Sequence, residues 1–119
     1  MSVDSVGRIL DELMSFSGVR SVLLAAREGL VIQKRGETAV DGETLAAIVP
    51  TLITDSVEAA EAMRGGSFRQ GVFEFDQGLL VLASVDGDSF LAVAVRGGAD
   101  IGALLYTLER ERGRLKELA

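Results

Sequence analysis

The sequence predicts an α+β fold, a three-layer sandwich with one helix on one face of a five-stranded antiparallel sheet and two helices on the other. Three segments repeat apolar residues at helical spacing, and five shorter segments are patterned as strands. Two strands, residues 79–84 and 90–95, are apolar on both faces, which indicates cover on both sides. Because only a short turn joins them, they pair antiparallel, and helices must supply the cover. The predicted order is α-β-β-α-β-β-β-α.

A helix and a hairpin are predicted to open the chain. Residues 2–16 are predicted to be helical because Val6, Ile9, Leu13 and Phe16 recur at helical spacing, with a glycine stop at position 18. Strands follow over residues 19–26 and 30–35. The loop between them, residues 27–29, ends in a glycine that supplies a positive φ.

The second helix is predicted over residues 41–63, from the N-cap Asp41 to the glycines at 65 and 66. Pro50 should kink it; a break into two helices is disfavoured because the apolar pattern continues in phase. The apolar arc spans about 200°, whereas packing on one sheet needs a stripe only slightly over ~100° wide. The excess predicts a second packing surface, such as another subunit. The polar arc carries Thr51, Thr54, Asp55 and Glu58.

The third strand, residues 68–75, is predicted to lie at a sheet edge beside this helix. The last helix follows from Asp100 to Leu118, and its mixed-charge stretch 109–117 is expected to face solvent. An uncovered edge strand invites pairing with another chain. Edge and helix together predict a two-fold interface with one sheet continuing across two subunits. The residues expected to form it are Leu45, Val49, Leu52, Phe68, Gln70 and Val72.

Composition excludes several classes of activity. The chain of 119 residues, interpreted as one domain over 1–119, has no His, no Cys and a formal net charge of −6. A Ser-His-Asp triad, a thiol nucleophile and the usual kind of zinc site are therefore absent. The negative charge argues against nucleic-acid or anionic-membrane binding. The first residues do not have the pattern of a signal peptide, and the lack of cysteine fits a cytoplasmic location.

The remaining motifs do not indicate a catalytic or ligand site. The glycine-rich loop at residues 97–102 lies between a strand and a helix, where phosphate loops occur, but it lacks their G-x-G-x-x-G or Gly-Lys-Ser/Thr spacing. Acid pairs such as Asp86 and Asp88 are interpreted as solvated turn residues. Arg64 and Arg69 are interpreted as surface arginines rather than arginine fingers. No cofactor, metal ion or catalytic residue is expected.

Three stretches, taken in their order and spacing, carry a family resemblance. They are the opening helix leading into residues 18–24 (GVRSVLL) with 28–32 (EGLVI), the Ala- and Leu-rich second helix, and residues 99–105 (ADIGALL), which enter the last helix. Across nearly the whole chain they resemble the roadblock/dynein light chain family, in particular its small bacterial MglB-like members. That family commonly has Asn where Asp100 stands, and either residue can cap a helix.

The resemblance implies a roadblock/profilin-like fold with strand order 2-1-5-4-3 and homodimers built through the second helix and third strand. It also implies a non-enzymatic role in which the paired second helices form a platform for a Ras-like small GTPase. Thr51, Thr54, Asp55 and Glu58 are expected to line this platform. The alternatives are a small-molecule sensor, which the low aromatic content disfavours, and a general dimerisation scaffold without a GTPase partner.

Overall fold

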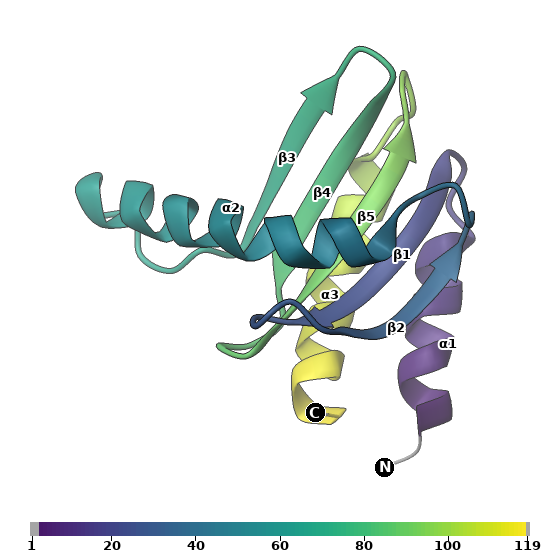
Figure 1. The fold of residues 1–119 in the computed structure, drawn as a ribbon, viewed down its shortest axis with the longest axis horizontal. Helices are drawn as coiled ribbons and strands as arrows, with labels where there is room; N and C mark the ends of the chain where they lie inside the picture. Colours follow the sequence, from purple (N-terminus) through teal and green to yellow (C-terminus); the bar gives the residue numbers. More distant parts are fainter. Residues whose placement is uncertain (1–2, 119) are drawn as a thin grey trace.

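A five-stranded antiparallel sheet forms the centre of the fold, with strand order β2-β1-β5-β4-β3 (Figure 1). The computed structural model describes residues 3–118. Along the chain the elements are α1 (Val3–Met14), β1 (Val19–Ala26), β2 (Val31–Gly36), α2 (Gly42–Ala62), β3 (Gln70–Phe75), β4 (Gly78–Ser84), β5 (Ser89–Arg96) and α3 (Gly102–Leu118). The predicted elements, their order and the strand order are confirmed.

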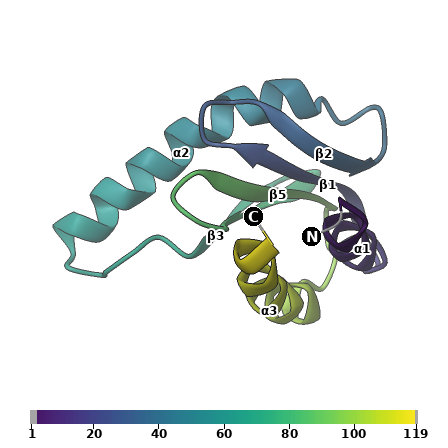
Figure 2. The same cartoon turned by 90° about the horizontal axis from the view of Figure 1, so that it is seen from below.

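Helices cover both faces of the sheet, α1 and α3 on one and α2 on the other (Figure 2). The central strand β5 supplies both cores: Leu91 and Val93 pack with α1 and α3, while Phe90 and Ala92 pack with α2. A strand covered on both faces needs apolar side chains at consecutive positions. Residues 90–95 do not alternate between apolar and polar because helices cover both faces of the strand, as predicted.

Element boundaries differ from the predicted ones by one or two residues. Ser2, where the first helix was expected to begin, lies outside the described residues. β3 begins at Gln70, because Phe68 packs into the α2 core before strand pairing starts. α3 begins at Gly102, whose backbone N–H donates to the Asp100 carboxylate at 3.0 Å. Asp100 therefore accepts a bond from the first helical residue just before the helix begins.

α2 is one continuous helix through Pro50. Asp41 caps its start, accepting hydrogen bonds from the Thr44 backbone N–H at 3.0 Å and the Thr44 hydroxyl at 2.7 Å. These bonds, the backbone one foremost, hold the pKa of the Asp41 carboxyl below its ordinary value of 3.8. The predicted N-cap is therefore confirmed.

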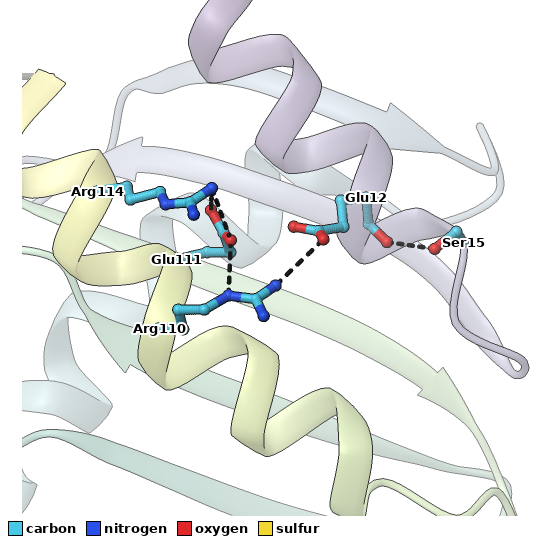
Figure 3. A network of polar contacts seen from close by, with 5 residues as sticks. All are labelled: Glu12, Ser15, Arg110, Glu111 and Arg114. Atoms are coloured by element: carbon cyan, nitrogen blue, oxygen red, sulfur yellow. Dashed lines mark hydrogen bonds and ion pairs between the residues drawn. The ribbon is translucent and has the colours of Figure 1, made fainter.

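One charged side chain of α3 is fully buried, contrary to the expectation that the stretch 109–117 faces solvent. Glu111 is 0% exposed; its carboxylate contacts Arg110 Nε at 3.0 Å and Arg114 Nη1 at 3.3 Å (Figure 3). Arg110 also reaches Glu12 of α1 at 3.2 Å, so the cluster ties the two helices together. Two arginines satisfy Glu111, which is how a carboxylate can be buried in a helix interface.

Among the described residues, no helix is both long and apolar enough to cross a membrane.

Candidate functional site

The C-terminal part of α2, after Ile53, has little cover from its own chain, since Val57 is its one hydrophobic side chain among the described residues that packs against the α2 core, and it is only half-buried. The helix crosses the sheet and continues past the edge strand β3 (Figures 1 and 2). Its buried residues, Gly42, Ala46, Val49 and Ile53, all lie in the first twelve positions, and none is buried after Ile53. We call the segment 54–63 the α2 overhang. A helical segment usually derives its stability from packing, so an uncovered one indicates a missing contact.

A second apolar row runs along α2 beside the buried one. Leu45, Ile48, Leu52, Ala59 and Met63 lie about 90° around the helix from the residues that face the sheet. Leu45 and Leu52 are half-buried, Ile48 is 51% exposed, and Met63 at the end of the overhang is 74% exposed. The apolar arc is wider than the chain's own sheet can cover.

The neighbouring strand β3 is a free edge, because β4 is its only partner in the sheet. Directly opposed residues in an antiparallel pair point to the same face. Phe73 lies opposite Leu80, which packs in the α2 core, so Phe73 and Phe75 face the α2 side. Phe75 is 60% exposed, and the end of β3 rises clear of α2 in Figure 1. The sheet therefore carries an aromatic patch, the half-buried Phe73 and the exposed Phe75, towards the end of β3 that α2 leaves uncovered.

The six residues predicted for the dimer interface occupy three different environments. Leu45, Leu52 and Phe68 are half-buried around the α2 core. Val49 is fully buried under its own helix and has no surface left for another chain. Gln70 and Val72 lie on β3 but point to the α1/α3 side, because Val72 is opposite Val81 of that core.

The predicted platform residues Thr51, Thr54, Asp55 and Glu58 are all exposed on α2. The Thr54 hydroxyl donates to the Pro50 carbonyl oxygen at 2.9 Å, which leaves little of that side chain's polarity for a partner. α2 contains four carboxylates and no Lys or Arg, and none of the four carboxylates has an ion pair within the described chain. The outward face of α2 is therefore acidic.

Sequence reasoning did not select Ile48, Met63 and Phe75, the most exposed apolar side chains of this surface, or the half-buried Phe73. The first two were within the predicted apolar arc of the helix. The alternating pair of phenylalanines in β3 was the signal for the other two, because residues two apart in a strand share a face.

The described part of the chain holds no cluster of metal-binding side chains. Within residues 3–118, no group of three or more acidic, His or Cys side chains could hold a metal ion. A hollow of about 460 Å³ lies between α2 and the turn after β4, lined in part by Arg27, Glu61 and Asp86. It is open to solvent, and its charged side chains are mixed in sign. We therefore take the exposed apolar surface of α2 and β3, rather than this hollow, as the candidate functional site.

Comparisons with known proteins agree with this architecture. Two uncharacterized proteins of Methanocaldococcus jannaschii are each 22% identical over 113 residues, covering 95% of this chain and 98% of theirs. The structure of Myxococcus xanthus MglB aligns with a TM-score of 0.88 at 16% identity, covering 99% of this chain and 97% of that one. A structure described as MglB with tetrameric arrangement aligns with a TM-score of 0.86 at 19% identity, covering 98% and 88%. At these identities the structures establish the fold.

The sequence itself matches a family description over most of its length. Residues 6–94 correspond to the Roadblock/LC7 domain. The match includes α2, β3 and all the residues of the candidate interface. The chain therefore belongs to the Roadblock/LC7 family.

Proposed function

We propose that this protein, acting as one domain over residues 1–119 in the cytoplasm, is a homodimeric adaptor that binds a Ras-like small GTPase and regulates or scaffolds it. The observation that carries the proposal is the largely uncovered α2 overhang beside the free edge of β3. The protein contributes no catalytic residue of its own in this proposal. Family membership supports the GTPase partner, and the surface geometry supports the dimer.

The surface is complementary to a second copy of itself. If two β3 strands pair antiparallel about a two-fold axis, the start of each strand lies beside the end of the other. α2 crosses near the start of β3, while the aromatic patch lies towards the end of the strand (Figure 1). The α2 overhang of one chain then lies over Phe73 and Phe75 of its partner. One contact thus covers the edge strand, the second apolar row and the aromatic patch together.

Such a dimer leaves the acidic faces of both α2 helices side by side and open to solvent. Thr51, Asp55 and Glu58 point away from the sheet and are not needed for self-association. Two copies of this face would form the platform for the GTPase. Because the face carries carboxylates without bases, we expect the bound partner to present Lys or Arg to it.

The dimer is tested by sedimentation velocity on two variants matched in exposure. Met63→Glu charges the apolar row at a side chain that is 74% exposed, so the isolated chain should fold normally. Tyr106→Glu changes an equally exposed side chain, 73%, on α3 in the opposite layer. We expect the wild type and Tyr106→Glu to sediment as dimers and Met63→Glu as a monomer. A monomeric wild type at tens of micromolar would refute the dimer.

The partner is tested with purified Ras-like GTPases of the same organism, each loaded with GDP or with a non-hydrolysable GTP analogue. Binding is measured by biolayer interferometry, and GTP hydrolysis is followed with and without the protein. Asp55→Lys with Glu58→Lys should abolish binding while leaving the dimer intact. A stable dimer that binds none of these GTPases would favour the general dimerisation scaffold.

A further inference from the structure

The last turn of α2 places an arginine where helices favour glycine. The Arg64 backbone N–H donates to the Glu61 carbonyl at 3.2 Å, and the Gly65 N–H donates to the Ala60 carbonyl at 2.7 Å. This pair of bonds is the Schellman ending, whose left-handed residue is usually glycine. Arg64 occupies that position with φ +53° and is the only non-glycine residue with positive φ among residues 3–118.

Apart from these two backbone bonds, no contact of the Arg64 side chain within residues 3–118 offsets the cost of this backbone conformation. Within the described residues Arg64 makes no side-chain hydrogen bond or ion pair, and its side chain is exposed. Two glycines follow it immediately, so the sequence has glycine available but not at the left-handed position. Strained residues that persist at a surface are enriched at binding sites, where another molecule uses the side chain.

The proposed dimer supplies an acidic counterpart. Antiparallel pairing of two β3 strands brings the segment that enters one strand next to the turn that leaves the other. Arg64 belongs to the entering segment at the end of the α2 overhang, and Asp76 begins the turn between β3 and β4. Asp76 and its neighbour Glu74 are exposed, and neither has an ion pair within residues 3–118.

We propose that Arg64 of each subunit forms an ion pair with Asp76 of the second copy, so that the dimer is held by two symmetric charge contacts at the ends of the overhangs. The inference rests on the proposed dimer and names a specificity contact within it. A mixed-sign contact of this kind fixes the register of the two strands and disfavours other pairings.

The test is a charge swap between subunits, read by native mass spectrometry after equilibration of the mixture. Arg64→Glu homodimers have two acidic pairs and Asp76→Arg homodimers have two basic pairs, both repulsive. The mixed dimer has one native Arg64–Asp76 pair and one reversed pair, both attractive. We expect the ratio of mixed dimers to homodimers to exceed the value for random pairing of an equimolar mixture by at least about fourfold at low salt, with the excess shrinking at high salt.

A matched control uses Arg8, an exposed arginine of α1 in the opposite layer. In this mixture the Arg8→Glu homodimer has two native pairs, the Asp76→Arg homodimer has two repulsive pairs, and the mixed dimer has one of each. The mixed dimer therefore has the mean energy of the two homodimers and should stay at the statistical share. A statistical mixture in the Arg64→Glu experiment, with the wild type dimeric, would overturn the Arg64 contact alone. A monomeric wild type would overturn the dimer itself. Circular dichroism of each variant confirms that it is folded.

Discussion

Removing both arginines that contact Glu111 should destabilise the fold far more than removing either one. Glu111 is fully buried and has Arg110 at 3.0 Å and Arg114 at 3.3 Å. With one arginine left, the carboxylate keeps a partner, and the loss should be about 1 kcal/mol, as for a partly exposed pair. With both gone, a buried charge has no partner, and such cases cost about 3–5 kcal/mol.

We expect Arg110→Ala with Arg114→Ala to lie near the lower end of that range, at about 3 kcal/mol, because water can enter where two half-exposed side chains were. Arg110 also contacts Glu12, but that contact is exposed and adds well under 1 kcal/mol. The two single losses should therefore sum to less than the double loss by about 1 kcal/mol.

Urea unfolding followed by circular dichroism measures these free energies. Protein concentration is held constant, because self-association would raise the apparent stability. Adding Glu111→Met to the double variant removes the unpaired charge and should restore most of the loss, since an apolar side chain of similar size suits the site. A double variant that loses less than about 1 kcal/mol, or no recovery with Met, would refute the reasoning.

Three further substitutions test the backbone and the helix cap. Thr44 keeps the pKa of Asp41 low, so the stability this group adds is present above pH 3.8 and lost as the pH falls through the lowered pKa; Asp41→Asn should flatten the acid side of the stability–pH profile. Gly36 has φ +107°, and a Cβ there would lie 2.2 Å from the Arg20 carbonyl oxygen, so Gly36→Ala should cost about 2 kcal/mol or more in urea unfolding. Gly113 lies within α3 with open space around it, so Gly113→Ala should raise the melting temperature by stabilising the helix by about 0.5–1 kcal/mol.

Local patterns were enough to predict the elements because each has its own period. Spacings of three and four, as from Val6 to Ile9 and from Ile9 to Leu13, identify a helix. Unbroken apolar runs such as residues 90–95 identify a strand that is covered on both faces. These patterns do not say which strands are neighbours. The order 2-1-5-4-3 came from the family resemblance, since it depends on contacts between segments far apart in the chain.

The sequence indicated which elements carry the candidate interface, α2 and β3, but it did not indicate which of their side chains are exposed. A wide apolar arc shows that a helix has two packing sides without showing which side meets its own sheet. Val49 and Ile48 both lie on that arc, about 100° apart, yet one is fully buried and the other is half exposed. Similarly, the alternation in β3 separates Val72 from Phe73 but does not assign either to the α2 side. Tertiary packing decides both which side of α2 meets the sheet and which face of β3 lies on the α2 side. The burial of Glu111 was missed because it depends on how α3 packs and on two arginines, one of which, Arg110, also contacts α1.

Side chains along β3 alternate between the two faces of the sheet, and this alternation limits the registers in which two β3 edges can pair. A final prediction follows from it. Opposed residues must share a face, so the two-fold axis must pass through a residue, either Val72 or Phe73, rather than between them. Centring on Val72 opposes two valines, whereas centring on Phe73 opposes each Val72 to a partner's Glu74. A pair of valines is more favourable than a valine opposite a glutamate, so we expect the two-fold axis to pass through Val72.

Val72→Lys should then place two lysines directly opposite each other and weaken the dimer roughly tenfold or more in sedimentation experiments. Val72→Thr, which keeps the branched shape, should have little effect. An undiminished Val72→Lys dimer would instead place the axis at Phe73, where the new lysine meets Glu74.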